Sequence, residues 1–128
     1  MLQILFIALG GSLGAIARYV FSNLVYQYIN DIFPWGTLVI NLTGSFFIGV
    51  FFELFDKAIL PSEMRSFITI GFLGAYTTFS TYSLETFNLL REGEISLASF
   101  NILGSNILSI VLVVFGIYSS RLLIKIFI

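Results

Sequence analysis

The stretch GAYTTFSTYS, residues 74–83, gathers seven hydroxyl-bearing side chains within ten positions of a strongly apolar chain. Of the 128 residues, 58% are hydrophobic and 10% are charged, and the mean hydropathy is +1.01. A soluble domain carries far more charge, so this composition indicates an integral membrane protein. The polar stretch then needs an explanation, because polar atoms inside a bilayer require partners.

The residues around this stretch predict an interrupted helix. Gly71 and Gly74 weaken a helix, and the hydroxyls of Thr77 and Thr78 can bond backbone groups that an interruption frees. We therefore expect a break near residues 74–78. At membrane depth such backbone groups are tolerated only when buried in protein or lining a cavity, and transport proteins use breaks of this kind to coordinate ions.

Two aromatic rings follow the expected break. If the helix resumes near Phe79, then Phe79 and Tyr82 lie on one face. The edge of an aromatic ring carries partial positive charge, so these rings could meet an anion without a formal charge. The alternative for Phe79 is packing against lipid or core, which explains most of the other phenylalanines among the fifteen in the chain.

Apolar stretches of about 20 residues, the length that crosses a bilayer, account for nearly the whole chain: Leu2–Asn23, Gly36–Phe55, Met64–Leu90 and Ser96–Arg121. The polar connections between them are too short for a second domain. We expect residues 1–128 to form one all-α domain of four transmembrane helices, the third broken near its middle. This predicts a multi-pass protein with the lipid bilayer around it, and we expect the inner (cytoplasmic) cell membrane as its location on the family resemblance given below.

Lysine and arginine residues at the span ends give only a weak orientation signal. Those on the side of both termini are Lys57, Arg65, Arg121 and Lys125, and those toward the other side are Arg18 and Arg91. This bias favours cytoplasmic termini but permits insertion in both orientations. Dual insertion is the condition for an antiparallel homodimer.

Polar residues recur every four positions in two spans and so form one stripe on each helix: Thr37, Asn41 and Ser45, and Asn101, Ser105 and Ser109. Two such stripes suggest a lined path. Hydrogen bonding between helices is the alternative, and it is the commoner role of single serines and threonines. For Asn41, which is large and lies mid-span, the two roles are equally balanced.

Three further features of the spans are a glycine pair, an arginine and an acid, and the last two each have two possible roles. The small-xxx-small pair Gly10 and Gly14 predicts close helix packing. Arg18 could snorkel to the interface or attract anions at a vestibule. Glu85, an acid well within a span, could be a proton relay or cation site, or a structural partner of nearby hydroxyls.

Composition also excludes several function classes. The chain has no Cys and no His, so it lacks a thiolate or imidazole metal site, a thiol nucleophile and the commonest general base. Its net charge of −1, with scattered cations, gives no nucleic-acid footprint. An intramembrane enzyme ranks last, because no paired carboxylates supply acid and base.

Taken together, these segments resemble the small bacterial fluoride channels, the Fluc (also called CrcB) family. The matching pieces, which occur in the family's order, are GGSLGAIARY, GTLVINLTGSFFIG, GFLGAYTTFSTYSLE and the Ser105/Ser109 stripe that ends at Gly116. They occupy all four expected spans, and the third-span motif is the most specific. Two positions depart from the family pattern: its second motif phenylalanine is Tyr82 here, and a fourth-span tyrosine of some members is Asn101.

The resemblance implies a passive fluoride-selective channel that exports fluoride as an antiparallel, dual-topology homodimer with two pathways. It implies a central structural sodium ion held by the backbone carbonyls of Gly74 and Thr77 from both subunits. The side chains that it assigns to the fluoride pathway or its vestibule are Phe79, Tyr82, Asn41, Ser105, Ser109, Thr37, Arg18 and Glu85. A selective pore must replace the water of this small, strongly hydrated anion, and amide, hydroxyl and ring-edge groups could do so.

Two rivals predict different chemistry. A small multidrug or metabolite exchanger also has four spans, but it normally places an acid in the binding cavity, commonly in the first span, which here has none. A structural or assembly subunit would use the polar stripes only to hold helices together. Ion flux from the purified protein distinguishes a channel from this second rival.

Overall fold

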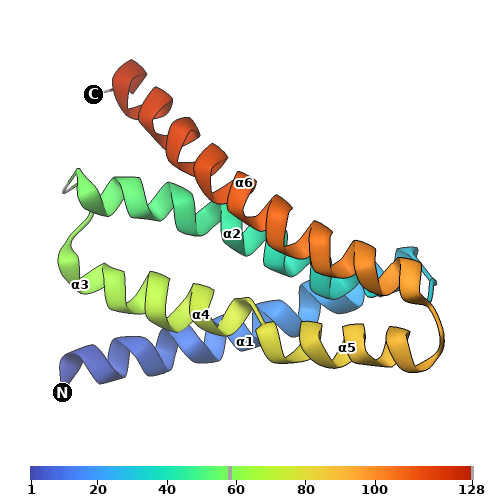
Figure 1. Cartoon of the computed structure of the whole chain (residues 1–128). Helices are drawn as coiled ribbons and strands as arrows, with labels where there is room; N and C mark the ends of the chain where they lie inside the picture. The colour runs from blue at the N-terminus through green and yellow to red at the C-terminus, as the bar shows by residue number, and fades with distance from the viewer. Residues whose placement is uncertain (58, 128) are drawn as a thin grey trace.

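The computed structural model describes residues 1–57 and 59–127, and these residues form helices with no strand among them. In chain order the helices are α1 (Leu2–Tyr28), α2 (Trp35–Asp56), α3 (Ser62–Arg65), η1 (Ser66–Leu73), α4 (Gly74–Tyr76), α5 (Phe79–Arg91) and α6 (Ile95–Phe127). Both termini lie toward one end of the molecule, and the α1–α2 and α5–α6 connections lie at the other (Figure 1).

In the described part of the chain, three helices are long and apolar enough to cross a membrane: α1, α2 and α6. They coincide with three of the expected spans, but α1 continues beyond Asn23 to Tyr28 and α6 beyond Arg121 to Phe127. Hydropathy indicates where a helix leaves the hydrocarbon core of the bilayer, whereas backbone hydrogen bonds determine where the helix ends. Most of α1 and α6 exposes large apolar side chains, as expected of surfaces that face lipid or a second subunit.

Residues 62–91, which contain the third expected span, are built from short pieces. A turn of α-helix, α3, leads into the π-helix η1 and then into the single turn α4. Thr77 and Thr78 are extended, and α5 begins directly after them at Phe79. A π-helix is rare and is frequently found at functional sites. That this composite segment crosses the bilayer as one unit stays a prediction.

Glycines bring α1 and η1 into backbone contact. Gly10 and Gly14 are buried, and a Cβ at either position would overlap a backbone carbonyl oxygen, that of Phe67 or Phe72. Gly71 completes the contact from the η1 side, because its own Cβ position lies 2.8 Å from the carbonyl oxygen of Ile7. The close packing expected of the Gly10/Gly14 pair is confirmed.

The second helix pair, α2 and α6, uses the same device. A Cβ at Gly49 would overlap the carbonyl oxygen of Val113, and one at Gly116 would overlap that of Phe46. At the far end of the molecule, a buried apolar cluster joins the residues before and within α2 to α5 and α6; its members are Phe33, Leu38, Leu89 and Ala98. The interruption lies beside α2, where a Cβ at Gly44 would overlap the side chain of Thr77.

Candidate functional site

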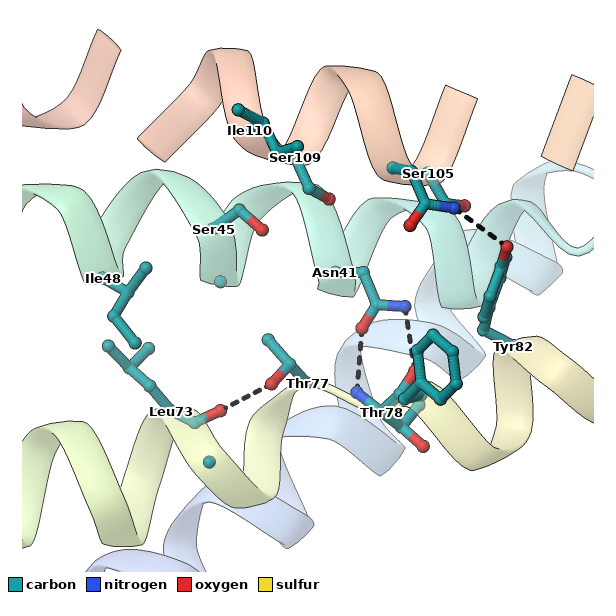
Figure 2. Close-up of a pocket in the computed structure, with 14 residues that line it drawn as sticks. Asn41, Ser45, Ile48, Leu73, Thr77, Thr78, Tyr82, Ser105, Ser109 and Ile110 are labelled. Atoms are coloured by element: carbon teal, nitrogen blue, oxygen red, sulfur yellow. Dashed lines mark hydrogen bonds between the residues drawn. The ribbon is translucent and has the colours of Figure 1, made fainter. Parts of the chain in front are cut away.

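Asn41 of α2 binds both backbone groups of Thr78 at the interruption (Figure 2). Thr78 N–H donates to Asn41 Oδ1 at 2.8 Å, and Asn41 Nδ2 donates to the Thr78 carbonyl oxygen at 3.0 Å. The two bonds fix the orientation of the amide, because only this orientation gives Thr78 both an acceptor and a donor. Hydrogen-bonded in this way, the Asn41 amide has one further N–H, and Asn41 lines the cavity described below.

The threonine hydroxyls complete the interruption. Thr77 Oγ1 donates to the carbonyl oxygen of Leu73 at 2.9 Å. Thr78 is the N-cap of α5, and its Oγ1 accepts from Thr81 N–H at 3.3 Å. The hydroxyls of the motif therefore replace part of the hydrogen bonding that a continuous helix would supply, as the sequence indicates.

Two backbone carbonyls lose their helical donors in this arrangement. In an uninterrupted helix, Thr78 N–H would donate to the carbonyl of Gly74, and Thr81 N–H to that of Thr77. These N–H groups donate instead to Asn41 Oδ1 and to Thr78 Oγ1. The carbonyls of Gly74 and Thr77 are thereby released from helical bonding, which is the condition for binding a cation. Among the described residues, no group of three or more Asp or Glu side chains could hold a metal ion.

A cavity of about 370 Å³ lies between α2, the interruption, α5 and α6. It brings together seven of the residues predicted for the site: Asn41, Gly74, Thr77, Phe79, Tyr82, Ser105 and Ser109. Thr78 and Ser45 line it as well (Figure 2). Residues from α2, η1, α4, the interruption, α5 and α6 thus meet at one cavity that combines polar, aromatic and aliphatic side chains.

The two predicted rings lie on one face of α5, with centroids 5.3 Å apart and planes inclined by 50°. Their environments differ: Tyr82 is 7% exposed, whereas Phe79 is 75% exposed. Its own chain therefore covers only a small part of the Phe79 ring at the edge of this cavity. The cavity is therefore incomplete on the Phe79 side.

The other three predicted residues, Arg18, Thr37 and Glu85, line a second cavity of about 280 Å³ between α1, α2 and α5. Thr37 Oγ1 donates to Glu85 Oε1 at 2.8 Å, so the acid has a hydroxyl partner, as one of its two interpretations requires. Thr78 lines both cavities. The predicted residues thus fall into two groups that adjoin at the interruption.

Comparison with known proteins places the chain in a family. The profile of the family described as CrcB-like protein, Camphor Resistance (CrcB), matches residues 5–117. The chain belongs to this CrcB-like family. The resemblance recognised from the four sequence segments is confirmed.

Relatives of this CrcB-like chain carry the name of an ion channel. It is 47% identical over 123 residues to the fluoride-specific ion channel FluC of Magnetococcus marinus, which covers 95% of this chain and 100% of the relative. It is 49% identical over 102 residues to the protein of the same name from Shewanella halifaxensis, with 80% and 82% covered. The expectation that the chain is not an enzyme agrees with these names. Family and apolar helices together indicate a multi-pass protein of the cell membrane.

The stripe on α6 divides between cavity and helix interface in this CrcB-like chain. Ser105 and Ser109 line the larger cavity, but Asn101 is 1% exposed and lies between helices. Asn101 Nδ2 donates to Thr86 Oγ1 at 2.9 Å, and its Oδ1 accepts from Ser105 Oγ at 3.2 Å. For Asn101, the interhelical alternative is therefore the correct one.

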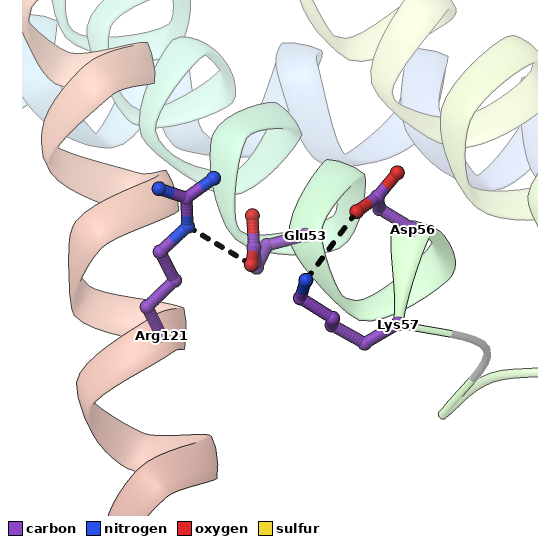
Figure 3. Close-up of polar contacts among 4 residues, drawn as sticks. All are labelled: Glu53, Asp56, Lys57 and Arg121. Carbon is purple, nitrogen blue, oxygen red and sulfur yellow. Dashed lines mark ion pairs between the residues drawn. The ribbon is translucent and has the colours of Figure 1, made fainter.

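Two residues of interest were not predicted. Asn106 lines the larger cavity and donates through Nδ2 to the Tyr82 hydroxyl at 3.1 Å. Glu53 is fully buried near the end of α2, where Arg121 Nε of α6 lies 2.9 Å from its Oε1 (Figure 3). Glu53 lies close to a span end, where charge is ordinary, so only an Arg at the matching depth of α6 could have signalled the pair.

Proposed function

We propose that this chain is the subunit of a fluoride-selective channel that lets fluoride leave the cell passively. The cavity between α2, the interruption, α5 and α6 supports this most directly. It has the Asn41 amide, the Ser109 hydroxyl on α6 and the rings of Phe79 and Tyr82, with no carboxylate among its lining residues. A small anion that must exchange water for several weak donors fits such a set.

The relatives add the identity of the anion. Proteins named fluoride-specific ion channel FluC match this chain over nearly its whole length. Similarity at this level supports fluoride as the anion that this chain conducts. The second cavity, with Arg18 on α1, would serve as the aqueous vestibule that attracts the anion, and the Thr37–Glu85 pair would form part of its wall.

The proposed working unit is an antiparallel homodimer with two pathways. Phe79 is mostly exposed at the cavity edge, which supports a second subunit that covers the ring and closes the path. A sodium ion at the dimer centre would be held by the carbonyls of Gly74 and Thr77, which have lost their helical donors. The positive charge of the sodium ion would offset the repulsion between the negative ends of carbonyl dipoles that both subunits contribute.

Reconstitution into liposomes tests the proposal. Purified protein is reconstituted in vesicles loaded with potassium fluoride or potassium chloride, and efflux is followed with ion-selective electrodes after valinomycin is added. Rapid fluoride loss with chloride retained supports the channel. If folded protein gives no fluoride efflux, or if efflux requires a proton gradient, the channel is refuted, and an exchanger with Glu85 as its acid replaces it.

A second test addresses assembly. Single cysteines at Lys57 and Arg91, near opposite ends of the bundle, are labelled with a membrane-impermeant maleimide in intact cells. Dual topology predicts labelling of about half of each population, whereas a single orientation predicts complete labelling of one cysteine and none of the other.

A further inference from the structure

The hydroxyl of Tyr82 has a fixed role as a hydrogen-bond acceptor. Asn106 Nδ2 of α6 donates to Tyr82 Oη at 3.1 Å, and the same nitrogen donates to the carbonyl oxygen of Ile102 at 2.7 Å. Both N–H groups of the Asn106 amide are therefore in use, and the orientation of that amide is set by the α6 backbone. Because the phenol oxygen already accepts a hydrogen bond, its own proton is left to donate elsewhere.

The Tyr82 hydroxyl can donate its hydrogen bond into the cavity. Tyr82 and Asn106 both line the 370 Å³ cavity, next to Ser105 and Ser109, and Figure 2 shows the Tyr82 hydroxyl pointing toward α6 at the level of Ser105. No acceptor for this proton occurs among the hydrogen bonds of the described residues. A phenol that accepts a bond from an amide is also a stronger donor, because hydrogen bonds in a chain polarise one another.

Attachment of α5 to α6 does not depend on this hydroxyl. The two helices are joined by the bond from Asn101 to Thr86, at 2.9 Å, and by the apolar contact of Leu89 and Ala98. Thr86 Oγ1 in turn donates to the backbone carbonyl of Tyr82 at 2.8 Å, which fixes the start of α5 without the phenol. The Tyr82–Asn106 bond is therefore not needed to hold α5 against α6.

We propose that the Tyr82 hydroxyl is an anion-binding donor in the cavity and that Asn106 is a positioning residue that aims it. The inference rests on the proposed fluoride conduction and deepens it. A ring edge attracts any anion by weak electrostatics, whereas an O–H donor favours the small anion that forms the stronger hydrogen bond. In this chain the pair is thus a further determinant of selectivity for fluoride over chloride, beside the ring that the family pattern keeps with phenylalanine at this position.

Two substitutions and their combination test this role in the liposome assay. Tyr82→Phe keeps the ring and removes the donor, so fluoride efflux should fall about tenfold, the worth of one hydrogen bond to a charged group. Chloride efflux should not fall, so the fluoride-to-chloride ratio drops. Asn106→Leu should also lower fluoride efflux, and the double variant should be no slower than Tyr82→Phe alone, because Asn106 acts only through the hydroxyl.

Matched controls make the same chemical changes outside the cavity. Tyr118→Phe removes an exposed phenol hydroxyl from α6, and Asn23→Leu removes an exposed amide from α1; both should conduct like the unaltered protein. Dimer content is checked for each variant by gel filtration.

The outcomes separate the two proposals. Absence of fluoride efflux from the unaltered protein overturns the channel itself. Selective efflux from both the unaltered protein and Tyr82→Phe, at equal rates, leaves the channel standing and overturns the role of the hydroxyl. If losses in the double variant multiply, Asn106 acts independently and its positioning role is wrong. Should Asn106→Leu fail to fold, Tyr82→Phe alone decides whether the hydroxyl binds the anion.

Discussion

Replacing Asn41 by alanine should destabilise the protein as well as block conduction. Thr78 is buried, and its N–H and carbonyl groups are both bonded to the Asn41 amide, at 2.8 and 3.0 Å. Alanine removes both partners and leaves no side chain long enough to reach the interruption. The N–H group of Thr78 then loses its acceptor entirely, whereas its carbonyl can keep the first helical bond of α5.

The expected loss follows from these two bonds. A buried N–H without an acceptor costs about 1–3 kcal/mol, and the lost donor to the carbonyl adds about 0.5–1.5 kcal/mol. Hydrogen bonds in membrane proteins average lower, about 0.6 kcal/mol each, because the unfolded state in lipid finds other partners. The free energy of unfolding should therefore fall by about 1 to 4 kcal/mol.

Unfolding in mixed micelles, titrated with sodium dodecyl sulfate and followed by circular dichroism, measures this change. Ser45→Ala is the matched control, because it removes a polar group that lines the same cavity one turn along α2. Asn41→Asp keeps an acceptor for Thr78 N–H and should show an intermediate loss. If Asn41→Ala unfolds within about 0.5 kcal/mol of the unaltered protein, below the range expected for two bonds, then Asn41 does not hold the interruption.

Three other substitutions have clear expected outcomes. Phe79→Ile should reduce fluoride efflux at least tenfold, the scale of one strong anion contact, while dimers still form on gel filtration; unchanged efflux would remove this ring from the pathway. Gly14→Ala should lower the yield of folded protein, because its Cβ would overlap a backbone carbonyl, whereas Gly11→Ala, whose nearest atom lies 3.9 Å away, should express normally. Arg121→Gln should lower the thermal midpoint in detergent, because buried Glu53 loses its cation, whereas Lys57→Gln breaks only an exposed pair with Asp56 at 3.8 Å (Figure 3); equal midpoints would contradict a stabilising role.

The sequence predicted those features that depend on local chemistry. Two glycines followed by a Thr–Thr pair favour an interrupted helix, and extended backbone occupies residues 77 and 78. A period-four pattern places Ser105 and Ser109 on one face, and both line the cavity. The π-helix η1 was not predicted from the third apolar stretch; it packs closely against α1, a tertiary contact that the sequence of the stretch does not show.

Features that depend on distant partners could not be read in this way. Asn106 lies one position from the Ser105 stripe, about 100° around the helix, so a search at period four passes over it. Its importance arises only because Tyr82 approaches from another helix. The role of Asn41 was balanced between pore and packing for the same reason: its partner is the backbone of Thr78, and no side-chain pattern reveals a backbone partner.

The ion pair between Glu53 and Arg121 has a consequence for biosynthesis. Glu53 belongs to α2, but the cation that it faces is on α6, which the ribosome makes after every other helix described here. Until α6 arrives, the acid near the end of α2 lacks the cation that it faces in the folded chain. Arrival of α6 therefore supplies the cation beside this acid, so the pair forms only once the last of these helices is in place.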